Sequence, residues 1–337
     1  MNRPLVPAIV TASLFAVMAT AAPAQDFPLT IAHKFGTTVI ESQPERVASL
    51  DFSGADNLIA LGIDPVTVRY FSGDYPRAVW PWADALMGAD PEILRGEINF
   101  EQIATTDPDV IIAIQSGITE DDYEKLSLIA PVVAVPEGKG DYELSWDERA
   151  LLAGRAVGLE TEAQAQVDAI GATLAQVAQD HPQWSDMSAV VAFTQGGDRT
   201  LPGGHTSYDV RAQLLGDMGF VTPEAIDALT EGEYAFYINL SAEQIDRLEA
   251  DLIVWRYDNS DWETVIDLFG RDRLAATEDG RDIYMDAELT GALSHASLLS
   301  LPFAIERLVP MIEAALDGDP ATHADGRPAA LMPVAAP

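Results

Sequence analysis

The sequence predicts an α/β protein made of two lobes joined by a long rigid helix. Short apolar runs rich in β-branched residues alternate with segments of helical periodicity along the chain. A Glu-Gln-Ile motif occurs once in each half, beginning at Glu101 and at Glu243. The chain has 337 residues, of which 48% are hydrophobic, so it is long enough to bury two cores.

Residues 1–24 have the form of a secretory signal peptide. Arg3 precedes a mostly apolar run over 5–19, and the Ala-Pro-Ala sequence at 22–24 is a small-residue cleavage site. Thr11 and Ser13 interrupt the run, which argues against a membrane-spanning anchor. We therefore expect export to the periplasm without a membrane anchor. The chain has no cysteine, which excludes a lipidated cysteine, a disulfide and a thiolate metal site.

The elements follow in order along the mature chain. Buried strands are predicted at 46–50, 66–70, 110–114, 132–135, 189–193 and 252–255. Helices are predicted at 55–61, 121–129, 210–218 and 242–248.

The lobe boundaries follow from a stretch without strand signal. Residues 145–180 show only helical spacing, interrupted at Gly158, which indicates one long helix or a pair of helices. This stretch would join an N-terminal lobe at 25–144 to a C-terminal lobe at 181–320. Residues 321–337 are expected to form a frayed tail.

The repeated motif indicates that the second lobe repeats the first. Each Glu-Gln-Ile is followed, eight residues on, by an aspartate and a buried strand, at Asp109 and at Asp251. Asn99 and Ser241 precede the motifs as capping residues, each with a glutamine three residues on.

The two motif glutamates have a local and a functional interpretation. An acid in the first turn of a helix interacts favourably with the helix dipole, by a few tenths to about 1 kcal/mol, which explains each one singly. A pair with one acid per lobe also suits a partner that carries arginine pockets, because carboxylates and guanidinium groups pair bidentately.

The net charge is −35, from 19 basic and 54 acidic residues. Such an excess repels phosphate backbones and anionic membranes, so nucleic-acid binding is excluded. We interpret the acidity as a solvated surface.

Candidate ligand-binding residues follow the predicted strands, because ligands of open α/β sheets lie beyond the carboxyl ends of the strands. Aromatic side chains supply apolar walls, and arginine supplies a fixed positive charge with five donors. Arg69 and Arg256, each beside a tyrosine, are the leading pair, although a structural ion pair explains each equally well. The segments after the strands are Asp51–Ser53, with Phe52 between them, Arg69–Phe71, Thr194–Arg199 and Trp255–Tyr257. From them we select Arg69, Tyr70, Arg199, Trp255, Arg256 and Tyr257 as ligand-binding residues.

A glycine-rich segment at 196–208 does not have the form of a nucleotide site. It lacks the Gly-Lys-Ser/Thr ending of a phosphate loop and does not open a helix directly. A hairpin or turn that uses glycine for positive φ is the simpler interpretation.

The five histidines show no metal-binding spacing, so we expect no protein metal site. If a metal arrives incompletely chelated, His205 or His295 could complete its coordination. His295 precedes a helix expected at 296–308, and an exposed or capping role is the commoner outcome for it.

Several stretches together resemble iron-siderophore periplasmic binding proteins of ABC importers. His33–Ile40, Pro44–Val47 and Leu61–Val66 resemble the opening of that class. Asn99–Ile103 with Pro108–Ile111 resembles its N-lobe motif, and Leu240–Gln244 resembles the C-lobe counterpart. The order and spacing of these stretches, over essentially the whole mature chain, are typical of the class that carries siderophores, haem and cobalamin.

The resemblance implies a class III periplasmic binding protein with two Rossmann-like lobes and modest closure on ligand. It implies that Glu101 and Glu243 dock onto arginines of the permease. It also implies that the segment after the glycines faces ligand, so His205, Ser207 and Tyr208 become contacts. The expected protein is a monomeric binding protein and not an enzyme, with a ferric siderophore as ligand and no covalently bound cofactor.

Three alternatives stay open. A haem or cobalamin binder belongs to the same class. A secreted hydrolase is disfavoured, because the chain has no Gly-x-Ser-x-Gly elbow and no carboxylate pair stands out. A zinc or manganese binder would need three or four convergent histidine and carboxylate ligands.

Overall fold

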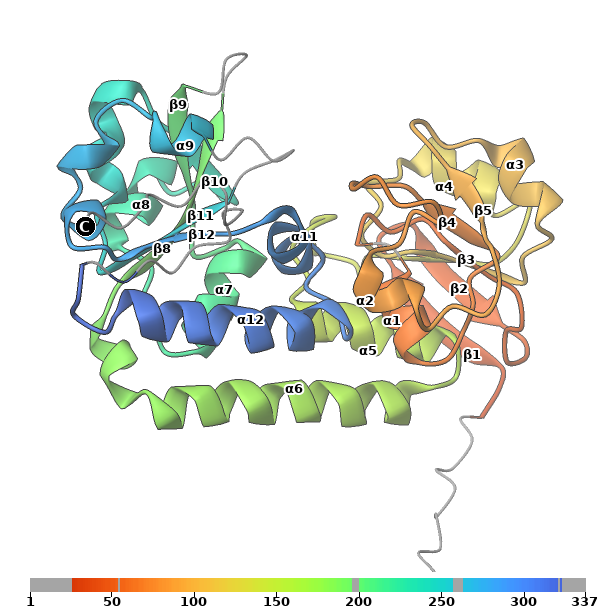
Figure 1. Cartoon of the computed structure of the whole chain (residues 1–337). Coiled ribbons are helices and arrows are strands. Elements are labelled where there is room, and N and C mark those ends of the chain that lie inside the picture. The colour runs from red at the N-terminus through yellow and green to blue at the C-terminus, as the bar shows by residue number, and fades with distance from the viewer. Residues whose placement is uncertain (1–25, 54, 196–199, 257–262, 321, 323–337) are drawn as a thin grey trace, which may run out of the picture.

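The computed structural model describes residues 26–53, 55–195, 200–256, 263–320 and 322. The signal peptide predicted at 1–24 lies outside the described residues, as do Arg199, Tyr257 and all of the predicted tail except Thr322. Two five-stranded sheets lie side by side, one in each lobe, with two long helices beneath them (Figure 1). The α/β fold with two lobes is therefore confirmed.

The N-lobe sheet is entirely parallel. Its strand order is β5-β4-β3-β6-β7. Successive residues of β6 point to opposite faces and enter two separate cores, as strand geometry requires. The strands are β3 (Val47–Ser49), β4 (Thr67–Arg69), β5 (Glu92–Leu94), β6 (Val110–Ala113) and β7 (Val132–Ala134).

Helices cover both faces of this sheet. One face packs against α1 (Asp56–Ala60), α2 (Pro81–Asp84) and the hairpin of β1 (Leu29–His33) and β2 (Gly36–Ile40). The other face packs against α3 (Phe100–Thr105) and α4 (Glu120–Leu126).

The C-lobe sheet is mixed, with strand order β10-β9-β8-β11-β12. β8, β11 and β12 are parallel, whereas β9 is antiparallel to both of its neighbours. The strands are β8 (Ala189–Gln195), β9 (Leu201–His205), β10 (Tyr237–Asn239), β11 (Leu252–Arg256) and β12 (Asp282–Tyr284).

The C-lobe sheet is also covered on both faces. The face toward the long helices packs against α7 (Val210–Asp217), α11 (Ala287–His295) and α12 (Ser300–Ala315). The other face packs against α8 (Glu224–Asp227), α9 (Glu263–Ile266), α10 (Ala275–Glu278) and the 3-10 helix η3 (Ala242–Leu248). Three short 3-10 helices complete the lobe: η1 (Pro182–Asp186), η2 (Ala228–Thr230) and η4 (Arg271–Arg273).

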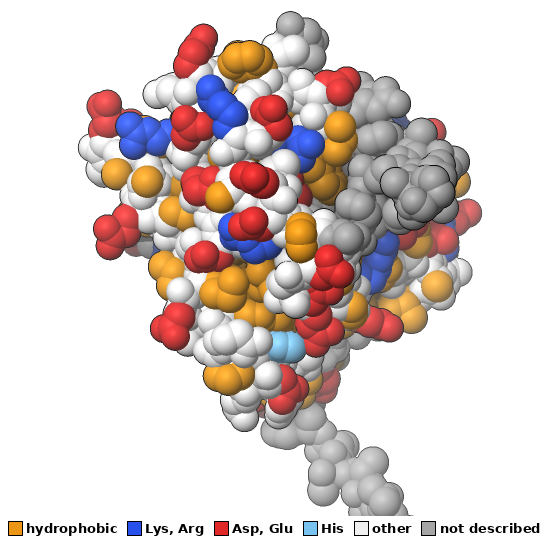
Figure 2. All heavy atoms as spheres, turned by 60° about the vertical axis from the view of Figure 1, so that its left-hand side comes forward, with side chains coloured by type: hydrophobic (Ala, Val, Ile, Leu, Met, Phe, Trp, Pro, Cys, Tyr) orange, Lys and Arg blue, Asp and Glu red, His pale blue; other side chains and the backbone are white. Residues whose placement is uncertain are grey.

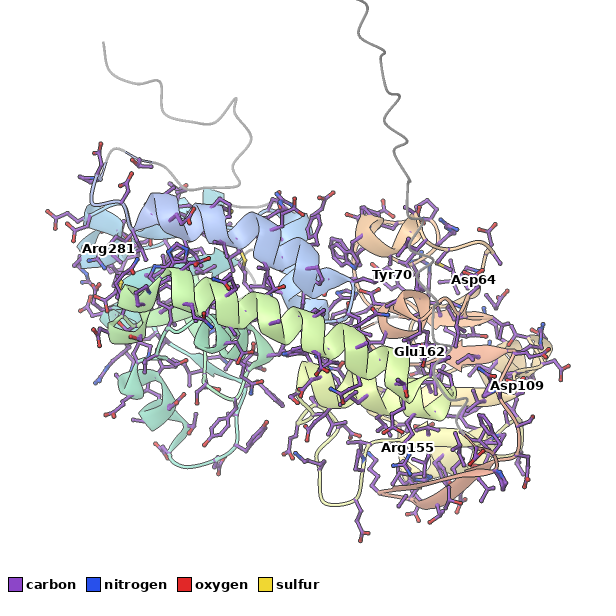
Figure 3. All side chains as sticks on the ribbon, turned by 90° about the horizontal axis from the view of Figure 1, so that it is seen from below. Asp64, Tyr70, Asp109, Arg155, Glu162 and Arg281 are labelled. Atoms are coloured by element: carbon purple, nitrogen blue, oxygen red, sulfur yellow. The ribbon has the colours of Figure 1, made fainter. Side chains whose placement is uncertain are left out.

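Two helices join the lobes, as one of the two predicted alternatives states. α5 (Trp146–Ala156) and α6 (Glu160–Asp180) are separated at Gly158, whose positive φ of 75° suits glycine. α5 places Trp146 in the C-lobe core and Ala153 in the N-lobe core. α6 is about 30 Å long and runs beside α12 beneath both lobes (Figure 3). The connection is a packed structural element.

Polar side chains also tie the lobes together. The carboxylate of Asp56, only 1% exposed in α1, accepts hydrogen bonds from Trp82 Nε1 (2.8 Å) and from the hydroxyl of Ser297 (2.7 Å). Ser297 lies between α11 and α12. A buried hydrogen bond thus connects the C-lobe to the N-lobe.

The two lobes repeat one structural device. Asp109, near the outer end of the N-lobe (Figure 3), accepts hydrogen bonds from the backbone N–H groups of Glu45 and Arg46, directly before β3. Asp251 accepts from the backbone N–H of Ser188, directly before β8. Each aspartate therefore fixes the entry of the strand beside its own, and the predicted repeat is present.

All six predicted strands are present, and the four helices predicted between them lie within three residues of their expected ends, although 242–248 is a 3-10 helix. The helix expected at 296–308 is present as α12 from residue 300 onward, but its start is wrong. α11 ends at His295, and α12 begins at Ser300 after Ala296 takes a left-handed φ of 43°. The residues after this turn contact α1, where the backbone N–H of Leu298 donates to the side chain of Asn57 (3.0 Å).

The surface agrees with the solvated interpretation of the acidity. Figure 2 shows carboxylates scattered over the face around the C-lobe, with basic side chains among them. Within the described part of the chain, no helix combines the length and the apolar character needed to cross a membrane.

We expect Asp56→Ala to lower the free energy of unfolding by about 2–4 kcal/mol, because the buried hydroxyl of Ser297 and the partly buried Nε1–H of Trp82 lose their acceptor. Chemical denaturation measures this loss. Asp56→Asn keeps one carbonyl oxygen and should cost less. Glu120→Ala, at an exposed acid in the first turn of α4, serves as the control. Equal free energies of unfolding for Asp56→Ala and this control would show that the hydrogen bonds to Asp56 do not stabilise the fold.

Candidate functional site

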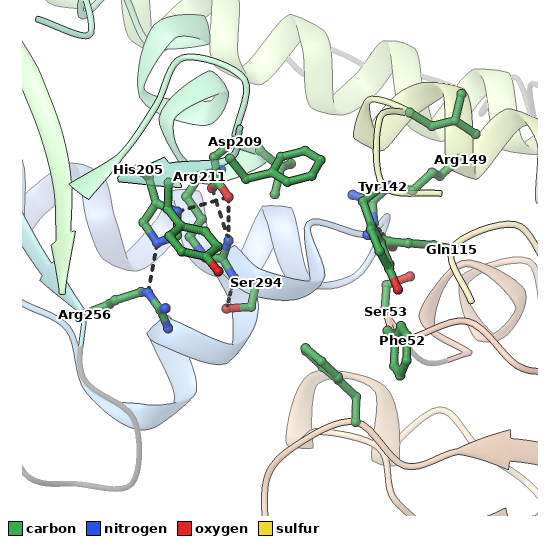
Figure 4. A pocket seen from close by; sticks show the side chains of 15 residues that line it. Phe52, Ser53, Gln115, Tyr142, Arg149, His205, Asp209, Arg211, Arg256 and Ser294 are labelled. Carbon is green, nitrogen blue, oxygen red and sulfur yellow. Dashed lines mark hydrogen bonds and ion pairs between the residues drawn. The ribbon is translucent and has the colours of Figure 1, made fainter. Parts of the chain in front are cut away.

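A cavity of about 350 Å³ lies between the lobes (Figure 4). Both lobes and α5 contribute to its walls. Its lining residues are Phe52, Ser53, Phe71, Gln115, Tyr142, Leu144, Arg149, His205, Asp209, Val210, Arg211, Phe236, Tyr237, Arg256 and Ser294. We call this cavity the inter-lobe pocket.

The N-lobe side of the pocket is aromatic. Phe52, Phe71 and Tyr142 follow β3, β4 and β7, at the carboxyl edge of the parallel sheet. The Phe52 ring centroid lies 5.5 Å from that of Phe71 and 6.2 Å from that of Tyr142. Phe71 and Tyr142 are 44% and 43% exposed, so a ligand can cover them. This wall suits the apolar surface of a ligand.

The C-lobe side of the pocket is charged. Arg256 Nε donates to His205 Nε2 (2.9 Å), and His205 Nδ1 lies 3.0 Å from Asp209 Oδ2. Arg211 Nη1 contacts both oxygens of Asp209 at 3.0 and 3.1 Å, and Arg211 Nη2 donates to Ser294 Oγ (2.9 Å). The chain of contacts Arg256–His205–Asp209–Arg211–Ser294 therefore fixes two arginines in this wall (Figure 4).

The hydrogen bonds determine the protonation of His205. Since Arg256 donates to Nε2, this nitrogen carries no proton, and the neutral ring has its proton on Nδ1, toward Asp209. Burial lowers the pKa of His205 to about 4. Burial alone would raise the pKa of Asp209, but His205 and Arg211 hold it well below its usual range. Asp209 is therefore a carboxylate at pH 7.

The glycines of β9 explain how this wall forms. A Cβ at Gly203 would collide with the ring of Phe193 on the neighbouring strand β8. With glycine there, the Phe193 ring centroid lies 5.1 Å from that of His205 and 5.0 Å from Arg256 Cζ. β8 and β9 pair as an antiparallel hairpin, as one of the two interpretations of the glycine-rich segment states. Gly203 and Gly204 do not have positive φ, so that reason for glycine is wrong for these two, and Gly196 and Gly197 lie outside the described residues. Gly203 and Gly204 are strand residues that allow close approach.

Arg149 of α5 lies at the junction of the two walls. It is 4% exposed and donates to Gln115 Oε1 of the N-lobe and to the carbonyl oxygens of His295 and Ala296 of the C-lobe. Burial lowers its pKa to about 10, so it is charged at pH 7. Nearby, burial raises the pKa of Asp51 to about 6, although the backbone N–H of Gln115 opposes this.

The structure brings together some of the predicted ligand-binding residues. His205 and Arg256 line the pocket. Arg69 lies beside it, with its guanidinium carbon 4.1 Å from the Phe52 ring centroid and Nη1 donating to the carbonyl of Ser116 (2.8 Å).

The other predicted residues lie elsewhere. Trp255 is fully buried in the C-lobe core, where its Nε1 donates to Asp282 (3.0 Å). Tyr70 packs near α1 and α2 under the Arg95 guanidinium. Tyr208 is 42% exposed and packs on Tyr234, outside the pocket lining.

His295 differs from its expected exposed or capping role. It is 3% exposed, its Nδ1 lies 2.9 Å from the carbonyl oxygen of Gly291, and its ring contacts Trp80, Trp82 and Phe71. It packs behind the aromatic wall. Its pKa is lowered by burial. Across the described ranges, no three His, Cys, Asp or Glu side chains converge as a metal site.

The sequence reasoning missed several pocket residues. Asp209 and Arg211 lie at the start of α7, and Arg149 lies inside a helix. Phe52 and Phe71 were among the candidates after the predicted strands, and the structure places both in the lining. Tyr142 lies farther beyond the end of its strand, β7, and was missed. No sequence signal distinguishes Arg149, because its partners come from both lobes.

Glu101 and Glu243 are both exposed, in the first turns of α3 and η3. Ile103 and Ile245, two residues after each, are completely buried. The two glutamates therefore occupy equivalent positions on the two lobes.

Residues 47–288 match the family described as periplasmic binding protein. The chain is 35% identical over 120 residues to the probable siderophore-binding lipoprotein YfiY of Bacillus subtilis, covering 34% of this chain and 35% of that protein. It is 26% identical over 209 residues to the Fe(3+) dicitrate-binding periplasmic protein FecB of Escherichia coli, covering 59% and 64%. Both matches span less than two thirds of the relative.

A solved structure extends the similarity. PiaA of Streptococcus pneumoniae, crystallised in complex with ferrichrome, superposes with a TM-score of 0.70 at 26% identity, covering 86% of this chain and 99% of that chain.

The protonation of His205 gives a residue-specific prediction. Its pKa of about 4 in the folded chain lies below the usual 6.5. As the pH falls from about 6.5 to about 4, His205 of the unfolded chain takes up a proton, whereas His205 of the folded chain does not. The stabilising contribution of neutral His205 is then lost, by about 1.4 kcal/mol per pH unit.

Asp51 acts in the opposite direction between about pH 4 and 6, so global unfolding does not isolate this effect. Imidazole NMR does. We expect His205 to keep its Nδ1–H tautomer without titrating above about pH 5. A midpoint near 6.5 would contradict the contacts described.

Proposed function

This chain belongs to the periplasmic binding protein family, and from that premise we propose that it captures a ferric siderophore between its lobes and delivers it to an ABC permease for iron uptake. Its place of action is the periplasm, which it reaches by the predicted signal peptide. It acts as a monomeric binding protein and not as an enzyme.

One observation carries this proposal. The inter-lobe pocket joins an aromatic wall to a wall of fixed arginines, inside a chain whose net charge is −35. A ferric chelate presents both apolar surface and oxygen atoms of negative charge, and the two walls match these two features. Arg149, Arg211 and Arg256 supply the donors.

The names of similar proteins support the same class of ligand. A siderophore-binding lipoprotein, an Fe(3+) dicitrate-binding protein and a structure with ferrichrome all concern iron chelates. Haem and cobalamin are the second candidates, but no contact in the pocket favours them. His205 Nε2 accepts from Arg256, and Nδ1 lies buried 3.0 Å from Asp209 Oδ2, which makes this histidine a poor axial ligand.

A binding experiment tests the proposal. Quenching of the six tryptophans should be saturable with at least one of a panel of ferric hydroxamate, catecholate and carboxylate chelates. Haem and cobalamin are added in separate arms and followed by their own absorption bands. Binding of haem or cobalamin alone would replace the siderophore proposal.

The docking role of the glutamates gives a second test. We expect the double change Glu101→Arg and Glu243→Arg to abolish uptake, because two carboxylates that pair with permease arginines would become repulsive. Affinity for the chelate should stay within a few-fold, since neither residue lines the pocket.

The matched control is Glu120→Arg with Glu224→Arg, which makes the same change of charge at exposed first-turn acids of α4 and α8. This control should transport normally. Uptake by the Glu101/Glu243 double variant at the rate of the control would remove the docking role.

A further inference from the structure

His205 occupies an unusual position in the charged wall. It is 3% exposed at the end of β9, and its two ring nitrogens face groups of opposite charge, Arg256 on one side and Asp209 on the other. A histidine with only a packing role would not require a polar contact at both ring nitrogens. Its ring instead forms the link between a pocket arginine and a buried carboxylate.

The geometry assigns His205 a single acid–base form. Nε2 must be an acceptor, because the guanidinium of Arg256 has only donors. Nδ1 then carries the proton and faces Asp209 Oδ2 at 3.0 Å. Arg256 also lines the inter-lobe pocket, so the group that His205 contacts belongs to the wall that a ligand would meet.

The surroundings hold this arrangement in place. Asp209 caps α7, where it accepts from the backbone N–H of Arg211 (2.9 Å), so the carboxylate cannot rotate freely. The Phe193 ring lies against both His205 and Arg256, and Gly203 gives that ring its room. The position of the Arg256 guanidinium is therefore set from α7 through the imidazole.

We propose that His205 is a positioning residue, which orients Arg256 through its unprotonated Nε2 for contact with a negatively charged oxygen of the bound ferric chelate. The chelate contact rests on the proposed function, whereas the orientation of Arg256 is a property of the free protein. The proposal therefore makes one claim that needs no ligand and one that does.

Two substitutions distinguish the role of Nε2 from the role of Nδ1. His205→Gln places an amide near the position of Nε2 and can still accept from Arg256 Nε. His205→Asn places its amide near the position of Nδ1, so it can still donate to Asp209 but cannot reach Arg256. Both replace the ring by a neutral amide, so the loss of packing against Phe193 is similar in the two variants.

The first measurement uses the free protein. In a ¹⁵N-resolved NMR spectrum of the arginine Nε–H groups, the Arg256 signal should be protected from solvent exchange in wild type and in His205→Gln. It should lose at least about tenfold of this protection in His205→Asn. Equal protection in all three proteins would overturn the proposal.

The second measurement is affinity for two probes, ferric dicitrate, which is anionic, and ferrichrome, which is a neutral chelate. With whichever probe wild type binds more tightly, His205→Asn should bind about tenfold or more weakly, and His205→Gln within about threefold of wild type. Thermal unfolding of both variants checks that they fold. Equal losses in the two variants would reduce His205 to a packing residue.

The outcomes distinguish this proposal from the proposed function. If wild type binds neither probe nor any chelate of the panel, the siderophore function fails, while the exchange measurement still decides the orientation of Arg256. If a chelate binds and the two variants behave alike, the function stands and the positioning role fails.

Discussion

The arrangement of the pocket depends on one buried cation. Arg149 projects from α5 and donates to a side chain of the N-lobe and to two carbonyl groups of the C-lobe. A buried guanidinium is costly unless its donors are paired, so both lobes must stay in register around it. Because α5 also contributes to both hydrophobic cores, the two walls are held at a set separation. Any closure on a ligand has to keep these contacts or exchange them.

The two lobes use this fixed separation differently. The parallel N-lobe sheet presents aromatic side chains at its carboxyl edge, the usual place for a binding site in such a sheet. The C-lobe departs from this pattern, because His205 comes from the antiparallel strand β9. The residues of its charged wall come from two strands, β9 and β11, and from the start of α7. An acidic protein thereby concentrates arginines where they are needed, and keeps most of its carboxylates on the solvated surface.

Hydrophobic patterning was enough to predict much of the fold and only part of the site. Strands such as 110–113 and 189–195 are buried on both faces, so they appear as continuous apolar runs. The Glu-Gln-Ile repeat was visible because capping and burial both constrain it, and the resemblance to periplasmic binding proteins was confirmed by the family match. Strand β9 was missed because its glycines suggest positive φ, whereas a Cβ at Gly203 would collide with the ring of Phe193 and one at Gly204 would crowd the side chain of Leu248. Arg149 and His295 were beyond sequence reasoning, because their surroundings come from distant parts of the chain.

Anomalous scattering at the iron edge, from crystals of the protein grown with the chelate that it binds most tightly, tests the central claim directly. The account predicts one strong iron peak between the lobes, with the chelate in contact with Arg256 on one side and with Phe52, Phe71 or Tyr142 on the other. An iron peak elsewhere on the molecule, or a chelate that leaves both walls uncovered, would contradict it.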